Sequence, residues 1–365
     1  MNFKSVFTFV FCFALFACES NEPKGELGIR ELRISMDSED LGDLNNSYQA
    51  KRPYPAKLRI DNRSYTVDLH YAGKSTLDAY KKSFQIDLGD EDYNGMKSIR
   101  LSSQAVDTTM LRSQLGFEVF SLAGVESPKV EPVAVFLNEK YLGLYQMIEP
   151  VDSDFFERKG INVAELYKTK YANANFSMDF LVNLDEAYSI KLKPKDDSAI
   201  RLLWETVLRD DAESFEDLEK ILDIDQYLRY MAAAVALKHW DGFNNNYFLV
   251  RPVGGRFQIV PWDLDRIYES DPWESHNIHG GNGLVVKLLS QDRYRIRYEE
   301  HLGTLLQTIT DESLLDRLDG WQRNISLAYD VDPVLGASDR SYAYDDLRKN
   351  MSEWLEYLKG LESGL

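Results

Sequence analysis

Polar side chains are gathered in the segment 239–266, between runs of aromatic and aliphatic residues. Asp241 and Asn246 precede the run "YFLV", and Asp263 follows the run "FQIVPW". A glycine-rich turn at 254–255 separates the two runs, so we expect an antiparallel hairpin whose open end brings these side chains into one cleft. Phosphoryl transfer needs such a set: one carboxylate orients the attacking hydroxyl, while an amide and a second carboxylate hold a divalent metal.

The spacing of these residues narrows the chemistry further. His239, Asp241 and Asn246 reproduce the pattern H-x-D-x-x-x-x-N of the protein-kinase catalytic loop, and Asp263 stands where the metal-binding aspartate of the following strand is expected. Two other interpretations stay open. In the first, these side chains do no more than cap turns, as Asn and Asp often do. In the second, Asn246, Asp263 and Asp265 bind Ca²⁺ without catalysis.

Composition and charge exclude several classes of protein. The chain is 44% hydrophobic and 12% aromatic, which indicates a packed core and not a disordered segment. Its formal net charge of −18 argues against a nucleic-acid-binding protein and against attachment to anionic lipid by charge. If the site holds a polyanion such as ATP, positive charge or metal must be concentrated there.

The N-terminal residues predict export. Residues 1–17 have the lysine and the short apolar run of a secretory signal peptide, and "LFAC" resembles a bacterial lipobox in which Cys18 is lipidated. Residues 18–30 would then form a polar tether. We therefore expect an extracytoplasmic lipoprotein, at the periplasmic face or cell surface, that meets the membrane through its lipid alone. A plain signal peptide with an incidental cysteine is the alternative.

The elements that must position the candidate site fall into two groups. Residues 31–165 read mostly as strands, with a hairpin turn at 138–140 and one helix from an Asp107 N-cap to Gly124. Residues 166–365 show helical periodicity, interrupted by the hairpin of the candidate site. The expected fold class is α+β, with the outline of a kinase-type bilobal fold: a β-rich N-lobe with one helix, then a mostly helical C-lobe.

At this point the chain resembles the spore-coat protein H (CotH) family of atypical, secreted kinases. The most specific element is "PWDLD" after "NNYFL"; the segments "KKSFQIDL", "MLRSQLGFEVFSLAG" and "VAVFLNEKYLGLYQMIEPVD" precede it in the family's order. The match extends from about Pro53 to Leu358, so residues 30–365 are expected to form one CotH-like kinase domain. The resemblance implies ATP as cofactor, with Mg²⁺ or Mn²⁺, and Ca²⁺ as a further option.

Carried over position by position, the resemblance implies roles for five residues. Asp241 is the catalytic-loop aspartate, Asn246 a metal ligand, and Asp263 the principal metal-binding aspartate. Asp265 would be a second ligand if the strand continues with its period of two. Lys82 looks like the lysine that reaches the nucleotide phosphates and assists catalysis.

Further candidates surround the expected nucleotide. Lys81 is a rival of Lys82, because in an extended strand only one of two neighbours can point into the cleft. In "AGKST", where kinases have a glycine-rich loop, Lys74 and Ser75 would hold phosphates through their side chains. Glu149 closes a strand at the hinge position, where backbone groups would meet adenine.

Two charged residues of the predicted helix are further candidate partners. Arg112 and Glu118 could pair with Lys82 or with the phosphates, although the phase of the helix does not decide between them. We favour a surface salt bridge for either one.

The expected function is transfer of the γ-phosphoryl group of ATP to a Ser- or Thr-type hydroxyl of an exported protein. An alternative from another class is a non-catalytic surface lipoprotein that uses the same fold as a binding or assembly module, for example in glycan capture. The joint presence of Lys82, Asp241, Asn246 and Asp263 favours the enzyme, because a pure binding role would not require them together.

Overall fold

A closed β-barrel forms the N-terminal part of the chain. The computed structural model describes residues 25–192, 194, 196–269, 277–335 and 337–362. Around the barrel the strand order is β1-β2-β3-β4-β5-β7-β6, and parallel pairing of β1 with β6 closes it. The strands are β1 (Arg30–Ser35), β2 (Tyr54–Ile60), β3 (Arg63–Ala72), β4 (Ser83–Asp87), β5 (Ser98–Ser102), β6 (Val130–Leu137) and β7 (Lys140–Ile148).

Alternation of apolar and polar residues explains these strands. Along β2 every second residue is buried, and the inward side chains of the seven strands form one apolar core. The predicted turn between β6 and β7 is confirmed: Asn138 and Glu139 have φ values of 47° and 63°, as the two central residues of a type I′ turn require. Local sequence thus predicts the strands and this hairpin.

The predicted helix of this half, α2 (Arg112–Leu122), begins later than expected. Asp107 lies five residues before Arg112, and its carboxylate still accepts a hydrogen bond from the Arg112 backbone N–H at 2.9 Å. At the other end Gly124 has a φ of 74°, as predicted for a residue that ends a helix. The short helices of this half are α1 (Ser38–Asn46), η1 (Tyr48–Ala50) and η2 (Ser75–Asp78).

A second sheet lies beside the barrel and contains the hairpin of the candidate site. Its antiparallel order is β11-β10-β8-β9. The strands are β8 (Val163–Thr169), β9 (Tyr188–Leu192), β10 (Tyr247–Pro252) and β11 (Gln258–Pro261), and α3 (Ser153–Glu157), η3 (Tyr171–Asn173), α4 (Met178–Leu181) and α5 (Leu184–Ala187) join them to the barrel and to one another. The sequence suggested a hairpin inserted among helices. Instead, β8 and β9 pair beside it, so that the hairpin is part of a four-stranded sheet. The expected boundary at 165 falls within β8.

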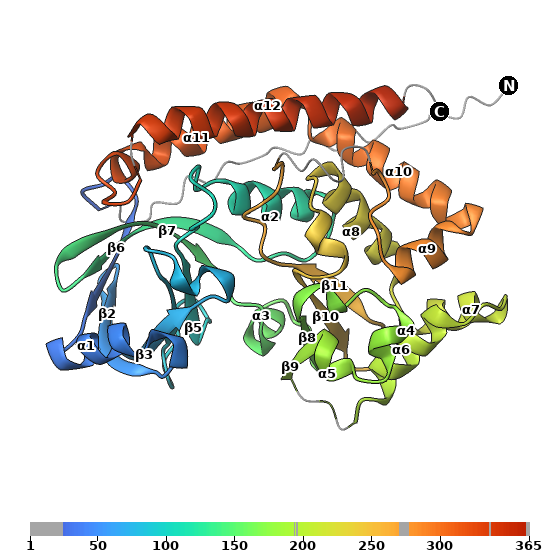
Figure 1. The fold of residues 1–365 in the computed structure, drawn as a ribbon, viewed down its shortest axis with the longest axis horizontal. Coiled ribbons are helices and arrows are strands. Elements are labelled where there is room, and N and C mark those ends of the chain that lie inside the picture. Colours follow the sequence, from blue (N-terminus) through green and yellow to red (C-terminus); the bar gives the residue numbers. More distant parts are fainter. Residues whose placement is uncertain (1–24, 193, 195, 270–276, 336, 363–365) are drawn as a thin grey trace, which may run out of the picture.

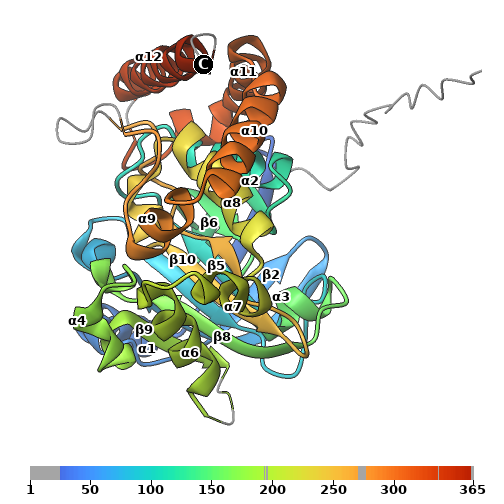
Figure 2. The same ribbon diagram turned by 90° about the vertical axis from the view of Figure 1, so that its right-hand side faces the viewer.

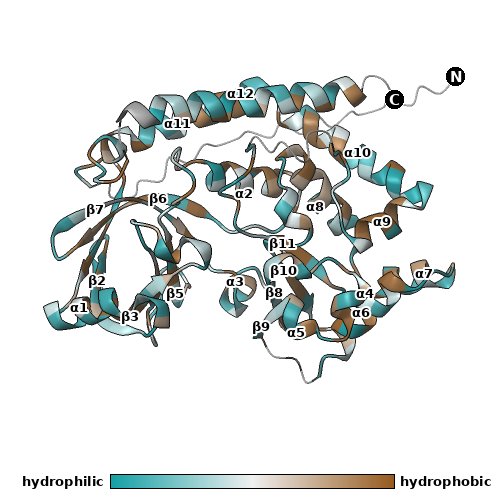
Figure 3. Ribbon diagram, in the orientation of Figure 1, coloured by the Kyte–Doolittle hydropathy of each residue, from teal (hydrophilic) through white to brown (hydrophobic). Residues whose placement is uncertain are grey.

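Helices make up most of the remaining chain, as their periodicity predicts. They are α6 (Ser198–Leu208), α7 (Glu213–Ile221), α8 (Ile224–Ala236), η4 (Trp240–Phe243), α9 (Gly283–Leu289), α10 (Asp292–Thr308), α11 (Asp311–Asp330) and α12 (Ala337–Glu362). α8 is buried along most of its length, whereas the long helix α12 is coloured mostly as hydrophilic in Figure 3. A β-rich half followed by a mostly helical half confirms the predicted α+β class.

Helices α11 and α12 lie side by side across both halves of the molecule (Figures 1 and 2). At the barrel, the Tyr141 hydroxyl donates to the Ala328 carbonyl at 2.8 Å. Over the helical half, the Trp354 indole N–H donates to the Val235 carbonyl at 2.7 Å. A continuous apolar core joins α2, α8, α10 and these two helices, so both halves are held in one arrangement around the second sheet.

Candidate functional site

The β10–β11 hairpin brings Asn246 and Asp263 to the same end of the second sheet. Tyr247 lies opposite Pro261 in the ladder, so Asn246 and Trp262 are the next pair. The Trp262 backbone N–H donates to the Asn246 carbonyl at 2.9 Å, which fixes this pairing. The predicted convergence of the two strand ends is thereby confirmed at the level of the backbone.

Both strand ends carry unusual backbone conformations. Asn246 has a φ of 55° and Asp263 a φ of 59°, in the left-handed region that Asn and Asp tolerate better than other non-glycine residues. Such conformations persist where the surrounding structure holds them, and they turn the following side chains away from the strand direction. The premise used for Asp265 is therefore wrong, because β11 ends at Pro261 and its period of two does not continue.

Asp263 and Asp265 nevertheless form a pair of nearby carboxylates. Burial, together with the negative charges of Asp263 and Asp107, raises the pKa of Asp265 to about 8. Asp263 itself is exposed. Two carboxylates and the Asn246 amide are hard oxygen donors of the kind that Mg²⁺ and Mn²⁺ prefer, so the residues present fit such an ion.

The acidic pair does not form a complete metal cage of protein side chains. Within the described ranges no group of three or more His, Cys, Asp or Glu residues has the geometry to hold a metal ion. An ion at Asp263 and Asp265 would need the Asn246 amide, water or substrate oxygens to complete its coordination. Mg²⁺ is usually bound in this way, through one or two carboxylates together with substrate phosphates.

Two cations from different sheets face Asp263. Lys168, on β8, pairs with Phe248 in the ladder, and its ammonium lies 4.7 Å from the centre of the Trp262 ring. Burial lowers the pKa of Lys168 to about 7, while the charge of Asp263 opposes the shift. Arg100, on β5 of the barrel, has its pKa lowered by burial and raised by the same carboxylate. Positive groups of the barrel and of the second sheet thus interact with the same carboxylate of the acidic pair.

More lysines extend this positive region. The charges of Lys191 and Lys74 lower the pKa of Lys168. Burial is the main cause that lowers the pKa of Lys51, and the charges of Arg100, Lys74 and Lys191 lower it further. Like charges gathered in this way repel one another. In a chain with a net charge of −18, this region is the concentration of positive charge that a bound polyanion requires.

Asp241 and His239 occupy the turn before Asn246. Asp241 is exposed on η4, and its backbone carbonyl accepts from the Asn245 N–H at 2.8 Å. His239 is buried; burial lowers its pKa to about 4, although a hydrogen bond to the Asn246 backbone opposes the shift. Its Nε2 has no hydrogen-bond partner among the described residues. His239 is therefore a neutral, buried side chain that supports the turn through its hydrogen bond to the Asn246 backbone.

The structure does not bring Lys82 or Lys81 to the acidic pair. The Lys82 ammonium donates to the Leu77 carbonyl at 2.6 Å and lies 4.3 Å from the centre of the Tyr48 ring. Lys81 is buried and pairs with Asp332 at 2.7 Å. Both lysines precede β4, which begins at Ser83, so the alternation expected of an extended strand does not apply to them. The prediction for Lys82 therefore lacks support from the geometry.

The remaining predicted nucleotide contacts lie at the edge of the cleft. Lys74 is exposed, with its ammonium 3.8 Å from the centre of the Tyr171 ring, and Ser75 begins η2. Glu149 lies after β7, but its backbone N–H donates to the Lys129 carbonyl at 2.9 Å. Its side chain pairs with Arg158 at 2.8 Å. The Glu149 N–H is therefore engaged within the protein and not directed toward a base.

The two charged residues of α2 have separate roles. Glu118 pairs with Arg317 of α11, which confirms the surface salt bridge favoured from the sequence. Arg112 instead is buried, and its guanidinium donates to the Ile267 carbonyl, so the expectation of a surface role is wrong for this residue. It connects α2 with the segment that follows Asp265.

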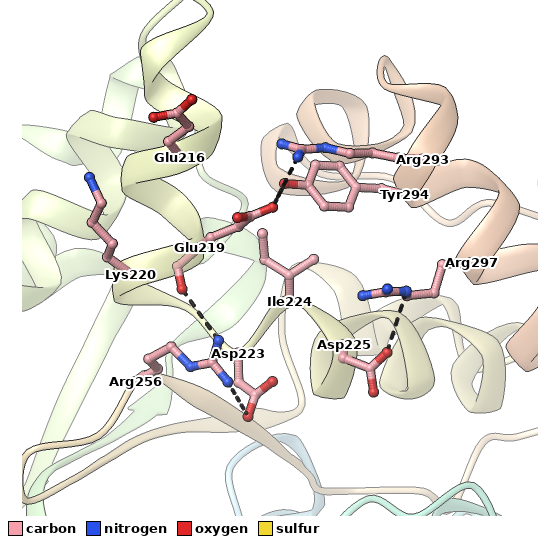
Figure 4. Close-up of a pocket in the computed structure, with 10 residues that line it drawn as sticks. All are labelled: Glu216, Glu219, Lys220, Asp223, Ile224, Asp225, Arg256, Arg293, Tyr294 and Arg297. Atoms are coloured by element: carbon pink, nitrogen blue, oxygen red, sulfur yellow. Dashed lines mark hydrogen bonds and ion pairs between the residues drawn. The ribbon is translucent and has the colours of Figure 1, made fainter.

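A separate groove lies between α7, α8 and α10, with a volume of about 810 Å³ (Figure 4). Its charged residues form arginine–carboxylate pairs: Arg256 with Asp223, Arg293 with Glu219, and Arg297 with Asp225, at 3.3, 3.3 and 3.8 Å. Arg256 follows the hairpin turn, so the groove adjoins the end of the β10–β11 hairpin opposite to Asn246. The candidate chemistry is not located there.

Sequence reasoning missed Arg100 and Lys168. Each is one cation within a short strand, and the partner strands that bring them to Asp263 are distant in the sequence. The local signal was weak: Lys168 is a lysine in the otherwise mostly buried strand β8. Such a position is costly for a charge that has no function or partner.

Known proteins resemble this chain over most of its length. A model of the CotH kinase protein family matches residues 69–359. Inner spore coat protein H of Bacillus subtilis (strain 168) is 26% identical over 302 residues, which are 78% of this chain and 83% of that protein. Invasin CotH7 of Rhizopus delemar is 22% identical over 320 residues, 77% of this chain but only 52% of the invasin.

Solved structures give a weaker likeness. A chain from the HipA, HipB and operator DNA complex of Shewanella oneidensis MR-1 has a TM-score of 0.39 and 10% identity, covering 91% of this chain and 74% of that one. The proinflammatory kinase CtkA of Helicobacter pylori has a TM-score of 0.36 and 12% identity, covering 77% and 95%. Both scores are below 0.5, so neither likeness extends to the details of the site.

None of the helices within the described residues is long and apolar enough to cross a membrane. The predicted signal peptide and Cys18 lie outside the described residues.

The family model covers the barrel from residue 69, within β3, and then the second sheet and the helices. It includes Asp241, Asn246, Asp263 and Asp265. We conclude that this chain belongs to the CotH kinase protein family.

Proposed function

We propose that this chain transfers the γ-phosphoryl group of ATP to a Ser- or Thr-type hydroxyl of an exported protein, with Mg²⁺ or Mn²⁺. Membership of the CotH kinase family supports a kinase-like phosphotransferase. The observation that carries the finer proposal is the arrangement of charge around Asp263. Asp265 lies beside it as a second carboxylate, while Lys168 and Arg100 face it from two different sheets.

Each of these residues has a defined task in the proposal. Asp263, Asp265 and Asn246 hold the divalent ion, which when bound neutralises charge on the phosphates. Lys168 and Arg100 donate hydrogen bonds to phosphate oxygens and favour the charge that develops during transfer. These two residues replace Lys82 in the role that the resemblance implied.

Asp241 is the proposed catalytic aspartate. Its exposure on η4 lets it meet the acceptor hydroxyl, orient it toward the γ-phosphorus and accept its proton. A bond forms between the hydroxyl oxygen and the γ-phosphorus, while the bond between the γ-phosphorus and the bridging oxygen breaks, and ADP leaves with that oxygen and its electron pair. His239 stays neutral beneath this turn and takes no proton in the proposal.

The acceptor and the location are proposed from the sequence. The signal-like residues 1–17 and Cys18 support a lipoprotein whose domain lies outside the cytoplasm and meets exported proteins. The net charge of −18 favours an acceptor protein that is basic around its hydroxyl. We propose neither a nucleic-acid partner nor a membrane contact beyond the lipid.

The proposal is tested by following label from γ-labelled ATP in the presence of Mg²⁺ or Mn²⁺. The full chain is offered itself and a basic model protein as acceptors, beside Asp263→Asn and Asp241→Asn. Metal-dependent label that vanishes in both variants supports the kinase. No label on either acceptor and no nucleotide-dependent rise in melting temperature would favour the alternative, a binding or assembly module with the same fold.

A further inference from the structure

Helix α2 packs at Gly116 against Leu264, in a contact without space for another atom. A methyl group placed on Gly116 would lie 2.7 Å from Leu264 Cδ1 and 2.9 Å from Leu264 Cβ. Both distances are shorter than carbon atoms tolerate, and the Cβ atom cannot move without its backbone. Leu264 lies between Asp263 and Asp265 in the chain and is fully buried. The absence of a side chain at Gly116 therefore sets where the backbone between the two carboxylates can lie.

Arg112 provides a second contact between the same helix and the same segment. Its buried guanidinium donates to the Ile267 carbonyl, two residues after Asp265. Asp107 lies 3.4 Å from its Nε and also accepts from its backbone N–H at 2.9 Å. A buried arginine held on one side by a carboxylate has few alternative rotamers, so it holds the Ile267 carbonyl in place.

The buried side of the segment is held by apolar packing and by a backbone hydrogen bond. Leu264, Ile267 and Tyr268 are all fully buried, and the Tyr268 N–H donates to the Leu237 carbonyl at 3.1 Å. Asp263 is exposed, and Asp265 is half-buried. A shift of the apolar anchors would therefore move the two carboxylates relative to each other and to Asn246.

We propose that Gly116 and Arg112 are positioning residues of the metal site, through which α2 sets the separation of Asp263 and Asp265. This inference rests on the proposed function, because it assumes that the two carboxylates bind the ion. It adds a role for α2 that does not involve a contact with nucleotide. Residues that orient metal ligands typically change metal affinity about 10- to 100-fold when they are altered.

The first test compares two glycine substitutions in helices. Gly116→Ala must displace Leu264, whereas Gly320→Ala in α11 meets only Arg323 Nη2, at 4.0 Å. Alanine in place of glycine favours a helix by about 1 kcal/mol in both variants, so this contribution is matched. The dissociation constant for Mn²⁺ is measured on the full chain without nucleotide. We expect it to rise about tenfold or more for Gly116→Ala and to stay at the parent value for Gly320→Ala.

The second test compares two arginines that hold α2. Arg112→Gln removes the donor to Ile267, while Arg317→Gln removes only the outer ion pair to Glu118. We expect Arg112→Gln to weaken Mn²⁺ binding and to speed amide exchange at 263–268 in the metal-free chain. Arg112→Lys keeps a donor and a charge, so it should recover part of the affinity. Arg317→Gln should change neither readout.

The outcomes separate this inference from the proposed function. If the parent binds Mn²⁺ and Asp263→Asn does not, the site exists, and unchanged Mn²⁺ affinity in folded Gly116→Ala and Arg112→Gln would overturn the positioning role. If the parent binds no Mn²⁺, the proposed function fails, and the inference fails with it. Equal losses in Arg112→Gln and Arg317→Gln would also overturn it, because a general loosening of α2 would then explain both.

Discussion

The cleft beside the β10–β11 hairpin and the groove between α7, α8 and α10 both gather charged side chains, but they arrange them differently. In the groove, arginines alternate with carboxylates and lie 3.3–3.8 Å from them. In the cleft, Asp265 lies beside Asp263, and the charge of Arg100 lowers the pKa of Lys168. In the cleft each charge therefore has a neighbour of the same sign as well as one of the opposite sign, whereas each arginine named in the groove is paired with its own carboxylate.

The charges of the groove neutralise one another within the protein, whereas those of the cleft are complemented only by a ligand. Exposed ion pairs contribute little and require nothing further. Gathered like charges raise the free energy of the folded chain, and only a ligand with the complementary pattern lowers it again. A divalent cation at the carboxylates together with phosphates at Lys168 and Arg100 supplies that pattern. The groove needs no ligand, because its arginines are already paired with carboxylates.

The largest expected effect comes from breaking the acidic pair. Asp263→Asn keeps the size of the side chain but removes the charge that holds the ion, so phosphoryl transfer should fall at least about 1,000-fold. Asp223→Asn makes the same chemical change in the groove and should leave the rate unchanged. Initial rates of label transfer measure both variants. Equal losses would show that the cleft and the groove do not differ in function.

A second prediction concerns the buried histidine beneath the cleft. The pKa of His239 is about 4 in the folded chain and about 6.5 in an unfolded one, so the unfolded chain takes up the proton first as pH falls. Stability should therefore decrease between pH 6.5 and 4, with a contribution of up to about 3 kcal/mol from this residue. In His239→Asn the pH dependence should be flatter by that amount, whatever the stability of the variant at neutral pH. Urea unfolding of the metal-free chain at several pH values measures the difference; identical slopes would show that His239 is not a buried neutral group.

A third prediction distinguishes the cations of the cleft. Lys168→Met and Arg100→Met should each raise the KM for ATP about 10- to 100-fold, because a charge-assisted contact to phosphate is lost. Lys82→Met should leave the KM unchanged, since its ammonium is engaged by Leu77 and Tyr48. Steady-state kinetics with varied ATP measure all three. A large effect of Lys82→Met alone would restore the role that the sequence implied for it.

The smallest effect is expected in the groove. Arg293→Gln removes an exposed ion pair to Glu219, so the free energy of unfolding should change by less than about 1 kcal/mol. The KM for ATP should not change. Chemical denaturation and the same kinetic assay test both statements. A clear rise in KM would connect the groove with the nucleotide site and weaken the contrast between the two regions.

Sequence patterns predicted the elements whose structure depends on residues close together in the chain. The β10–β11 hairpin follows from two short runs and the glycine turn between them, and its ladder places Asn246 beside Trp262 as expected. The hairpin of β6 and β7 likewise follows from its Asn138-Glu139 turn. Helical periodicity also predicted the helical character of the segment that contains α11. In each of these elements the deciding contacts lie within a few residues along the chain.

Contacts between distant strands could not be predicted in this way. Closure of the barrel depends on parallel pairing of Arg30 with Val133, about a hundred residues apart. Lys168 and Arg100 approach Asp263 because β8 pairs with β10 and the barrel lies alongside. The resemblance assigned Lys82 to the phosphates and an extended strand was expected at this position, but β4 begins at Ser83, and the Lys82 ammonium instead donates to the Leu77 carbonyl. The spacing and the hairpin pattern predicted the acidic residues, and the resemblance assigned their roles, whereas only the fold identified the cations.

The most direct test of the charge arrangement is calorimetric titration of Mg²⁺ and ATP into the full chain, beside Asp263→Asn. Complementary charge predicts saturable binding of one nucleotide that requires Mg²⁺ in the parent and is strongly weakened in the variant. Nucleotide binding of equal strength with and without Mg²⁺, or in Asp263→Asn, would contradict the assignment of the acidic pair as the metal site. Absence of binding in the parent would contradict the nucleotide site itself.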